Sequence, residues 1–85
     1  MAVDTRDRIR EFIKQEILFD DRDAVVADDT PLLSGIVDSL GLTQMVAFIE
    51  DEYDVEIDDA DISASNFRTI ADINRLIQQK LQEKV

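Results

Sequence analysis

The chain has 85 residues, of which 20 are acidic and 9 basic, so its formal net charge at pH 7 is -11. This length allows one hydrophobic core but no deep substrate cleft beside it, and we expect residues 1–85 to form a single domain. The negative charge disfavours nucleic acid and anionic membranes as partners, and the absence of cysteine and histidine excludes disulfides, thiolate nucleophiles and the commonest general base.

Residues from about 4 to 19 have the pattern of an amphipathic helix. Apolar side chains fall on one face at helical spacing, and charged side chains fill the opposite face. The apolar face consists of Ile9, Phe12, Ile13 and Ile17. Asp4 or Thr5 is a suitable N-cap, because a side-chain oxygen there can accept a hydrogen bond from the first turn.

Residues 20–37 predict a loop. The segment contains the only proline, Pro31, one of the two glycines, Gly35, and several aspartates. Such a long loop is unusual in a compact domain, so we expect apolar side chains to anchor it to the core. Those expected to be buried are Val25, Val26, Leu32, Leu33 and Ile36.

The strongest helical pattern runs from Ser39 to about Tyr53, with Asp38 as a good N-cap. Its buried stripe is predicted to be Leu42, Met45, Val46, Ile49 and Tyr53. Acids then alternate with Val55 and Ile57, but a lone strand would have no partner, so this segment is interpreted as a loop.

Two further helices complete the prediction. A one-turn helix is expected over residues 60–64, and a last helix over about 70–83 opens with Thr69 and Asp72 in a capping arrangement. The buried stripe of the last helix is predicted to be Ile70, Ile73, Leu76, Ile77 and Leu81. Three main helices and a short one predict an all-α, four-helix bundle with a long loop between the first two main helices.

Ser39 lies in the first turn of the helix predicted over residues 39–53. Unpaired backbone amides and the positive end of the helix dipole favour a bound or attached anion at such a position. By themselves, Asp38, Ser39 and Leu40 more often mark an ordinary helix start than a functional site. The surrounding sequence is therefore needed to distinguish the two interpretations.

The segment over residues 29–41, which reads Asp-Thr-Pro-Leu-Leu-Ser-Gly-Ile-Val-Asp-Ser-Leu-Gly, resembles the acyl carrier protein superfamily. The similarity covers nearly the whole chain, as far as residues 66–70 at the entry to the last helix. It implies an acyl-carrier-like four-helix bundle in which Ser39, between Asp38 and Leu40, receives a covalent 4'-phosphopantetheine arm from coenzyme A. Ser34 is the rival attachment residue, but it lies in the loop without a following helix and is ranked below Ser39.

The resemblance implies a carrier that is not itself an enzyme. A phosphopantetheinyl transferase would attach the arm, using magnesium. A cargo-loading ligase or acyltransferase would then load an acyl or aminoacyl group as a thioester. Downstream enzymes of fatty-acid, polyketide or nonribosomal-peptide-type biosynthesis would receive it.

Two departures from fatty-acid carriers bear on the type of carrier. Two residues, rather than one, separate Gly35 from Asp38, and Gly41 replaces a frequent acid. Together with Ser39 and Gln44, these residues look more like stand-alone carriers of aminoacyl groups, including D-alanyl carriers. The segment over residues 67–70 is similar to free-standing peptidyl carriers.

A strip of apolar and acidic side chains leads along the predicted helix away from Ser39. On a helical wheel, Leu40 and Phe48 fall outside the buried stripe, beside Gln44, Ala47 and Asp51. Residues 23–67 hold 12 of the 20 acids and no lysine or arginine. We expect partner enzymes to dock on this strip with basic patches, the alternative being that Leu40 and Phe48 are ordinary surface or a second core contact.

Other protein classes explain less of the sequence. The acids from Glu50 to Asp61 suggest calcium binding, but neither Gly35 nor Gly41 follows the acidic ladder of an EF-hand loop, and no metal site is expected. An acidic protein-interaction module without a prosthetic group, such as an inhibitor or nucleic-acid mimic, is the main alternative. An enzyme with paired carboxylates is the weakest interpretation, because we do not expect so short a chain to enclose a pocket that excludes water.

The apolar runs are short throughout the chain. None is long enough to span a bilayer or to act as the core of a signal peptide. We therefore expect a monomeric, cytoplasmic protein.

Overall fold

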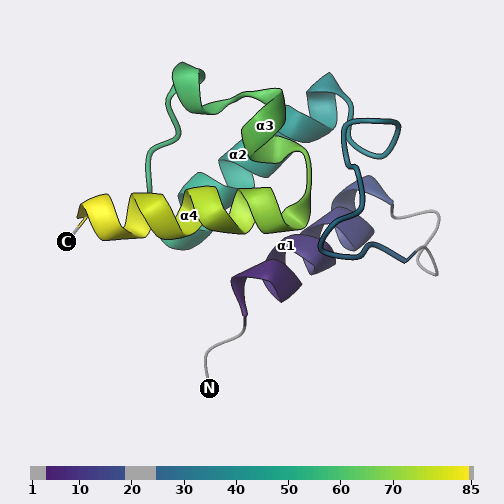
Figure 1. Ribbon diagram of the computed structural model, residues 1–85, viewed down its shortest axis with the longest axis horizontal. Helices are drawn as coiled ribbons and strands as arrows, with labels where there is room; N and C mark the ends of the chain where they lie inside the picture. Colours follow the sequence, from purple (N-terminus) through teal and green to yellow (C-terminus); the bar gives the residue numbers. More distant parts are fainter. Residues whose placement is uncertain (1–3, 19–24, 85) are drawn as a thin grey trace.

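The computed structural model describes residues 4–18 and 25–84, and within them it contains helices and loops but no strand (Figure 1). The elements are α1 (Thr5–Phe12), the π-helix η1 (Ile13–Ile17), α2 (Ser39–Tyr53), the 3-10 turn η2 (Asp59–Asp61), α3 (Ala64–Phe67) and α4 (Ile70–Lys84). The predicted all-α fold of three main helices and a short one is confirmed.

The first helix consists of α1 and η1 together, and we call this pair helix one. Asp4 caps its start by accepting a hydrogen bond from the Arg6 N–H at 2.9 Å. Its last turn is π-helical, with the Leu18 N–H donating to the Ile13 carbonyl at 2.8 Å. The helix was expected to reach about residue 19. It ends at Ile17, and residue 19 lies outside the described residues.

The loop before α2 is anchored by fewer side chains than predicted. Val26, Leu32 and Val37 are buried, whereas Val25 is 86% exposed and Leu33 37% exposed. The predictions for Val25 and Leu33 are therefore wrong. Val25 and Val26 lie outside any helix or turn, where neighbouring side chains point to opposite sides, so burial of Val26 turns Val25 outward. Leu33 lies in the turn that follows the buried Leu32.

Backbone and carboxylate contacts hold this loop against two helices. The Asp28 carboxylate accepts from Arg10 and, at 3.2 Å, from Arg6, both on helix one. The Asp28 carbonyl accepts from the Ala71 N–H of α4 at 3.0 Å. The Leu32 N–H donates to the carbonyl of Arg68, just before α4, at 2.8 Å. The loop is thus fixed at both residue 28 and residue 32.

The short helix lies later in the chain than predicted. Residues 60–64 do not form one helix. Instead η2 ends at Asp61 and α3 begins at Ala64. Two separate caps explain the division: Asp58 and Asp61 form a capping box around η2, and the Ser63 hydroxyl accepts from the Asn66 N–H at 3.3 Å to start α3.

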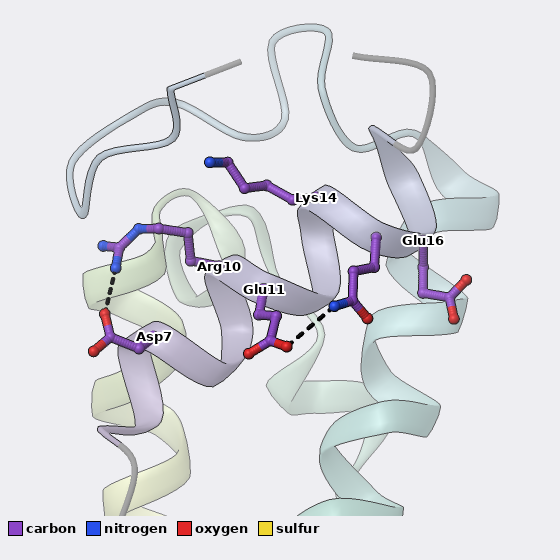
Figure 2. Close-up of a pocket in the computed structure, with 6 residues that line it drawn as sticks. Asp7, Arg10, Glu11, Lys14 and Glu16 are labelled. Carbon is purple, nitrogen blue, oxygen red and sulfur yellow. Dashed lines mark hydrogen bonds and ion pairs between the residues drawn. The ribbon is translucent and has the colours of Figure 1, made fainter. Parts of the chain in front are cut away.

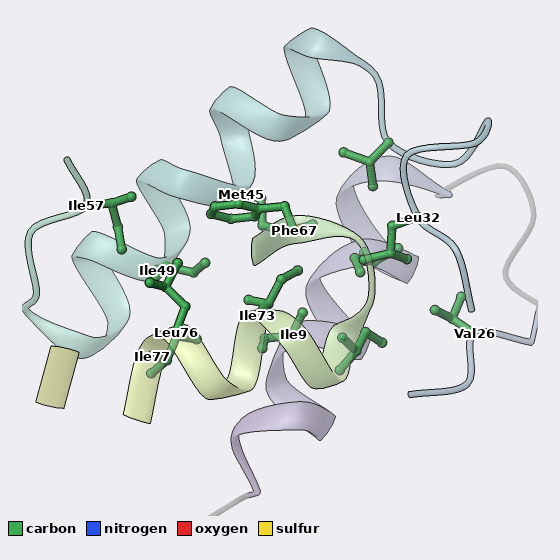
Figure 3. Close-up of a cluster of buried hydrophobic side chains, with 13 residues drawn as sticks. Ile9, Val26, Leu32, Met45, Ile49, Ile57, Phe67, Ile73, Leu76 and Ile77 are labelled. Atoms are coloured by element: carbon green, nitrogen blue, oxygen red, sulfur yellow. The ribbon is translucent and has the colours of Figure 1, made fainter. Parts of the chain in front are cut away.

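The core lies between helix one, α2, α3 and α4 (Figure 3). These four elements each contribute to it, with Ile9 from helix one, Met45 from α2, Phe67 from α3 and Ile73 from α4 (Figure 3). Within the predicted stripes Leu42, Val46, Tyr53 and Leu81 are only half-buried. The buried apolar side chains are Ile9, Ile13, Val26, Leu32, Val37, Met45, Ile49, Ile57, Phe67, Ile70, Ile73, Leu76 and Ile77.

Removing the Asp28 carboxylate is expected to loosen the loop. Asp28→Ala should lower the free energy of unfolding by about 1 kcal/mol, because the ion pairs with Arg6 and Arg10 are only partly buried. Chemical denaturation measures the change. Asp29→Ala is the matched control, since Asp29 is exposed and makes no ion pair within the described chain. Equal effects of the two substitutions would contradict the anchoring role of Asp28.

A second prediction concerns the ion pair that holds η2 to α4. Lys80 Nζ lies 2.6 Å from Asp61 Oδ2, and this hydrogen bond, helped by the Asp58 N–H, lowers the pKa of Asp61 below the ordinary 3.8. A lowered folded-state pKa contributes stability above the unfolded pKa, and that contribution is lost as pH falls through the folded pKa. The wild type should therefore exceed Asp61→Asn in unfolding free energy at neutral pH.

The difference in unfolding free energy between wild type and Asp61→Asn should disappear as pH falls below 3.8. Urea denaturation at a series of pH values measures it. Asp59→Asn serves as the control, because Asp59 forms no ion pair in the part of the chain that the structure describes. A difference between wild type and Asp61→Asn that stays constant down to the lowest pH would contradict the prediction.

Candidate functional site

The start of α2 is placed by the turn that precedes it. The Val37 N–H donates to the Leu32 carbonyl at 2.8 Å, and Gly35 has a φ of 136°, a conformation that favours glycine. Val37 is buried, and the chain then emerges at Asp38 and Ser39, both exposed. Asp38 Oδ1 accepts from the Gly41 N–H at 2.8 Å and is the N-cap of α2, as its sequence position indicates.

The Ser39 hydroxyl differs from those of the other serines in its hydrogen bonding. Ser34 Oγ donates to the Pro31 carbonyl at 3.3 Å, while the Ser63 and Ser65 hydroxyls lie 3.2 Å apart at the cap of α3. Among the described residues, the Ser39 hydroxyl alone of the four serine hydroxyls makes no hydrogen bond, and Ser39 is exposed. It is therefore free to be modified without breaking a structural contact.

The first turn of α2 fits a phosphodiester on Ser39. The Gly41 N–H is occupied by the Asp38 side chain and the Leu42 N–H by the Asp38 carbonyl at 2.8 Å. Within the described chain, the N–H groups of Ser39 and Leu40 have no acceptor. Free amide groups at the positive end of a helix dipole favour a nearby anion, so an attached phosphate meets a suitable environment.

Gly41 explains how helix one approaches this turn so closely. It is buried, and a Cβ atom there would lie 3.4 Å from each of Asp38 Oδ1, Ile17 Cδ1 and Val37 Cγ1. A larger acidic side chain would be pressed against the Asp38 carboxylate and two apolar side chains. The contact with Ile17 of the π turn was not predicted, because helical periodicity gives no signal for a π turn.

The predicted docking strip is exposed except at one residue. Leu40 is 67% exposed, and Gln44, Ala47 and Asp51 are exposed along the same helix. Phe48 is half-buried, and its ring stacks on Phe12 of helix one with a centroid distance of 4.4 Å and an interplanar angle of 20°. Phe48 therefore makes a second core contact while still lining the surface.

The polar side of helix one has a separate hollow of about 620 Å³ (Figure 2). Its lining is mixed in charge, with Arg10 bound to Asp7 at 2.6 Å and Gln15 to Glu11 at 3.1 Å. None of its lining residues belongs to α2, so this hollow is distinct from the surface around Ser39.

Some of the acids from Glu50 to Asp61 have structural roles. Glu50 Oε2 accepts from the Ile57 N–H at 2.9 Å, and Asp61 pairs with Lys80. Over residues 4–18 and 25–84, no three acidic side chains gather as a metal site requires. The helices in the same described ranges include none long and apolar enough to cross a membrane.

One comparison with known proteins identifies the family of the chain. A family model described as "Phosphopantetheine attachment site" matches residues 7–77, which is most of the chain. A comparison with curated proteins gave no significant match. The family match confirms the resemblance to the acyl carrier protein superfamily, whose members bind 4'-phosphopantetheine covalently. The chain therefore belongs to the phosphopantetheine-attachment family and is a phosphopantetheine-bearing carrier protein.

Proposed function

We propose that Ser39 holds the 4'-phosphopantetheine arm and that the chain carries acyl or aminoacyl groups on it as thioesters. The observation that supports this most strongly is the free, exposed Ser39 hydroxyl at the first residue of α2, inside the matched residues 7–77. The family match alone does not distinguish Ser39 from Ser34. The hydrogen bond of Ser34 to Pro31 and its position in a loop favour Ser39.

The residues around Ser39 would orient the arm and leave the chemistry to other enzymes. Asp38 fixes the first turn through its bond to the Gly41 N–H, and the amides of Ser39 and Leu40, which have no acceptor in the described chain, would be available to an attached phosphate. When bound, the arm supplies the thiol that a chain without cysteine lacks. The chain itself would catalyse no step.

Carrier proteins of this family interact in general with a phosphopantetheinyl transferase and with biosynthetic enzymes. We place the docking surface for these enzymes on α2, at Leu40, Gln44, Ala47, Phe48 and Asp51. Exposure of all but the half-buried Phe48 supports this placement. Basic patches on the partners would complement the acids of this helix, as electrostatic steering requires.

An aminoacyl cargo is the more specific form of the proposal. It rests on the similarity of residues 35–44 to stand-alone aminoacyl carriers. Gly41 stands where fatty-acid carriers frequently have an acid. Its burial against Ile17 and Val37 is a packing reason for glycine at this position. The loading enzyme would then be an adenylating ligase rather than an acyltransferase.

Intact mass measures attachment of the arm directly. Incubation with coenzyme A, magnesium and a promiscuous phosphopantetheinyl transferase should add about 340 Da, the mass of one phosphopantetheine group, to the wild type. Ser39→Ala should gain nothing, because the free hydroxyl is gone. Ser34→Ala, the matched control, should be modified like the wild type. No gain in the folded wild type would favour the acidic protein-interaction module instead.

Substitutions of Asp38 separate its capping role from its charge. Asp38→Ala should lower the free energy of unfolding by about 1 kcal/mol, since it removes the side-chain acceptor of the Gly41 N–H. Asp38→Asn should stay within a few tenths of a kcal/mol of the wild type, because asparagine caps helices equally well. Chemical denaturation of both variants measures this, and equal losses would show that capping is not the main contribution of Asp38.

A further inference from the structure

The surface between helix one and α2 contains a shallow trough with an aromatic floor. A hollow of about 540 Å³ adjoins a second one of about 270 Å³, and both are lined by Phe12, Glu16 and Phe48. The stacked rings of Phe12 and Phe48 belong to the lining of both hollows, and both residues are only half-buried. We call this surface the trough. The larger hollow is lined by Phe12, Glu16, Gln44, Ala47, Phe48 and Asp51.

The rim of the trough is acidic, and each of the two helices contributes an acidic side chain to it. Glu16 comes from helix one and extends away from Lys14 (Figure 2), and Asp51 comes from α2. Both are exposed, and neither forms an ion pair with any residue that the structure describes. Arg8, which lines the smaller hollow, is paired with Glu52. Over residues 4–18 and 25–84, the trough therefore presents an apolar floor between negative charges that have no ion-pair partner.

Core packing alone does not account for this arrangement. A stack of Phe12 on Phe48 that served only to extend the core would need no acids beside it. Other acids of the described chain are either paired, as Asp28 is with Arg10 and Asp72 is with Arg75 at 3.1 Å, or unpaired but outside the trough, as Asp29 and Asp59 are. Unpaired acids from two helices around exposed aromatic area are typical of a surface that binds a basic, partly apolar partner.

We propose that the trough docks a basic amphipathic helix of an enzyme that acts on the arm. An apolar side chain of that helix would pack on Phe12 and Phe48, while lysine or arginine side chains on its flanks would pair with Glu16 and Asp51. The choice of partner rests on the proposed function, in which enzymes act on an arm held by Ser39. The trough adds helix one to the surface that these enzymes recognise. A second copy of this chain is a poor occupant, because two chains of charge -11 repel each other.

The position of the trough suits such a partner. Asp51 lies on the same helix as Ser39 and about 18 Å further along it, at a rise of 1.5 Å per residue. A partner helix in the trough would therefore hold α2 near its C-terminal half and leave the first turn clear. The reactive end of the arm would stay accessible to the active site of that enzyme.

A synthetic amphipathic helix with leucine on one face and lysine on the other is the probe for this surface. Its dissociation constant for the whole chain, measured by fluorescence anisotropy at low salt, should rise about tenfold in Glu16→Lys. Glu83→Lys is the matched control, because it makes the same charge change at an exposed acid of α4 and should shift the constant less than about twofold. Phe48→Ala should weaken binding as Glu16→Lys does.

Three results would overturn the proposal. Equal weakening by Glu16→Lys and Glu83→Lys would show that the peptide senses only net charge. Unchanged binding in Glu16→Lys, an exposed position whose substitution leaves the core intact, would show that the peptide binds elsewhere. Much weaker binding to the chain carrying its arm than to the unmodified chain would show that the arm itself occupies the trough.

Peptide binding and arm attachment are separate readouts. Failure of Ser39 modification would remove the carrier function while the peptide measurement still reported on the trough. Normal modification with no selective effect of Glu16→Lys would instead remove the trough from the recognition surface. The two failures are therefore distinguishable.

Discussion

The buried Leu32 holds the turn that leads into Ser39. Its N–H donates to the Arg68 carbonyl just before α4, and its own carbonyl accepts from the N–H groups of Ile36 and Val37. With the side chain fully buried, one residue joins the loop to α4 and also closes the turn into α2. A buried backbone group without a partner is costly, so these bonds leave the turn little freedom. The first turn of α2 consequently emerges at a fixed place on the surface.

The proposed functional side chains need little else from the fold. Ser39 would contribute a hydroxyl, Asp38 a cap and the α2 surface a set of contacts, while the reactive thiol would come from the arm. This division of roles agrees with a chain that has neither cysteine nor histidine and in which the hydroxyl of Ser39 is left free. It also agrees with the hollows of about 620 and 540 Å³, since Ser39 lines neither of them. A carrier needs surfaces that partners recognise, not a pocket that excludes water.

Helical periodicity and capping chemistry predicted the parts of the fold that depend on neighbouring residues. They predicted the start of α2 at Ser39, its Asp38 cap and the Thr69–Asp72 pair, in which Thr69 Oγ1 lies 2.9 Å from Asp72 Oδ2. They failed where tertiary contacts decide. Periodicity cannot tell Val25 from Val26 in a loop, and it places no boundary between η2 and α3. The π turn that brings Ile17 onto Gly41 and the pairing of Phe12 with Phe48 depend on how two distant segments pack.

The attachment of the arm to Ser39 is tested most directly in the protein as its host makes it. Trypsin should release residues 23–68 as one peptide, since residues 23–67 contain no lysine or arginine. This peptide includes all four serines, so fragment ions within it distinguish the attachment residue. Tandem mass spectrometry of chain purified from its host should place a phosphopantetheine group on Ser39, with any cargo released by hydroxylamine as expected for a thioester. A group located on Ser34, or a peptide that is never modified, would contradict the account.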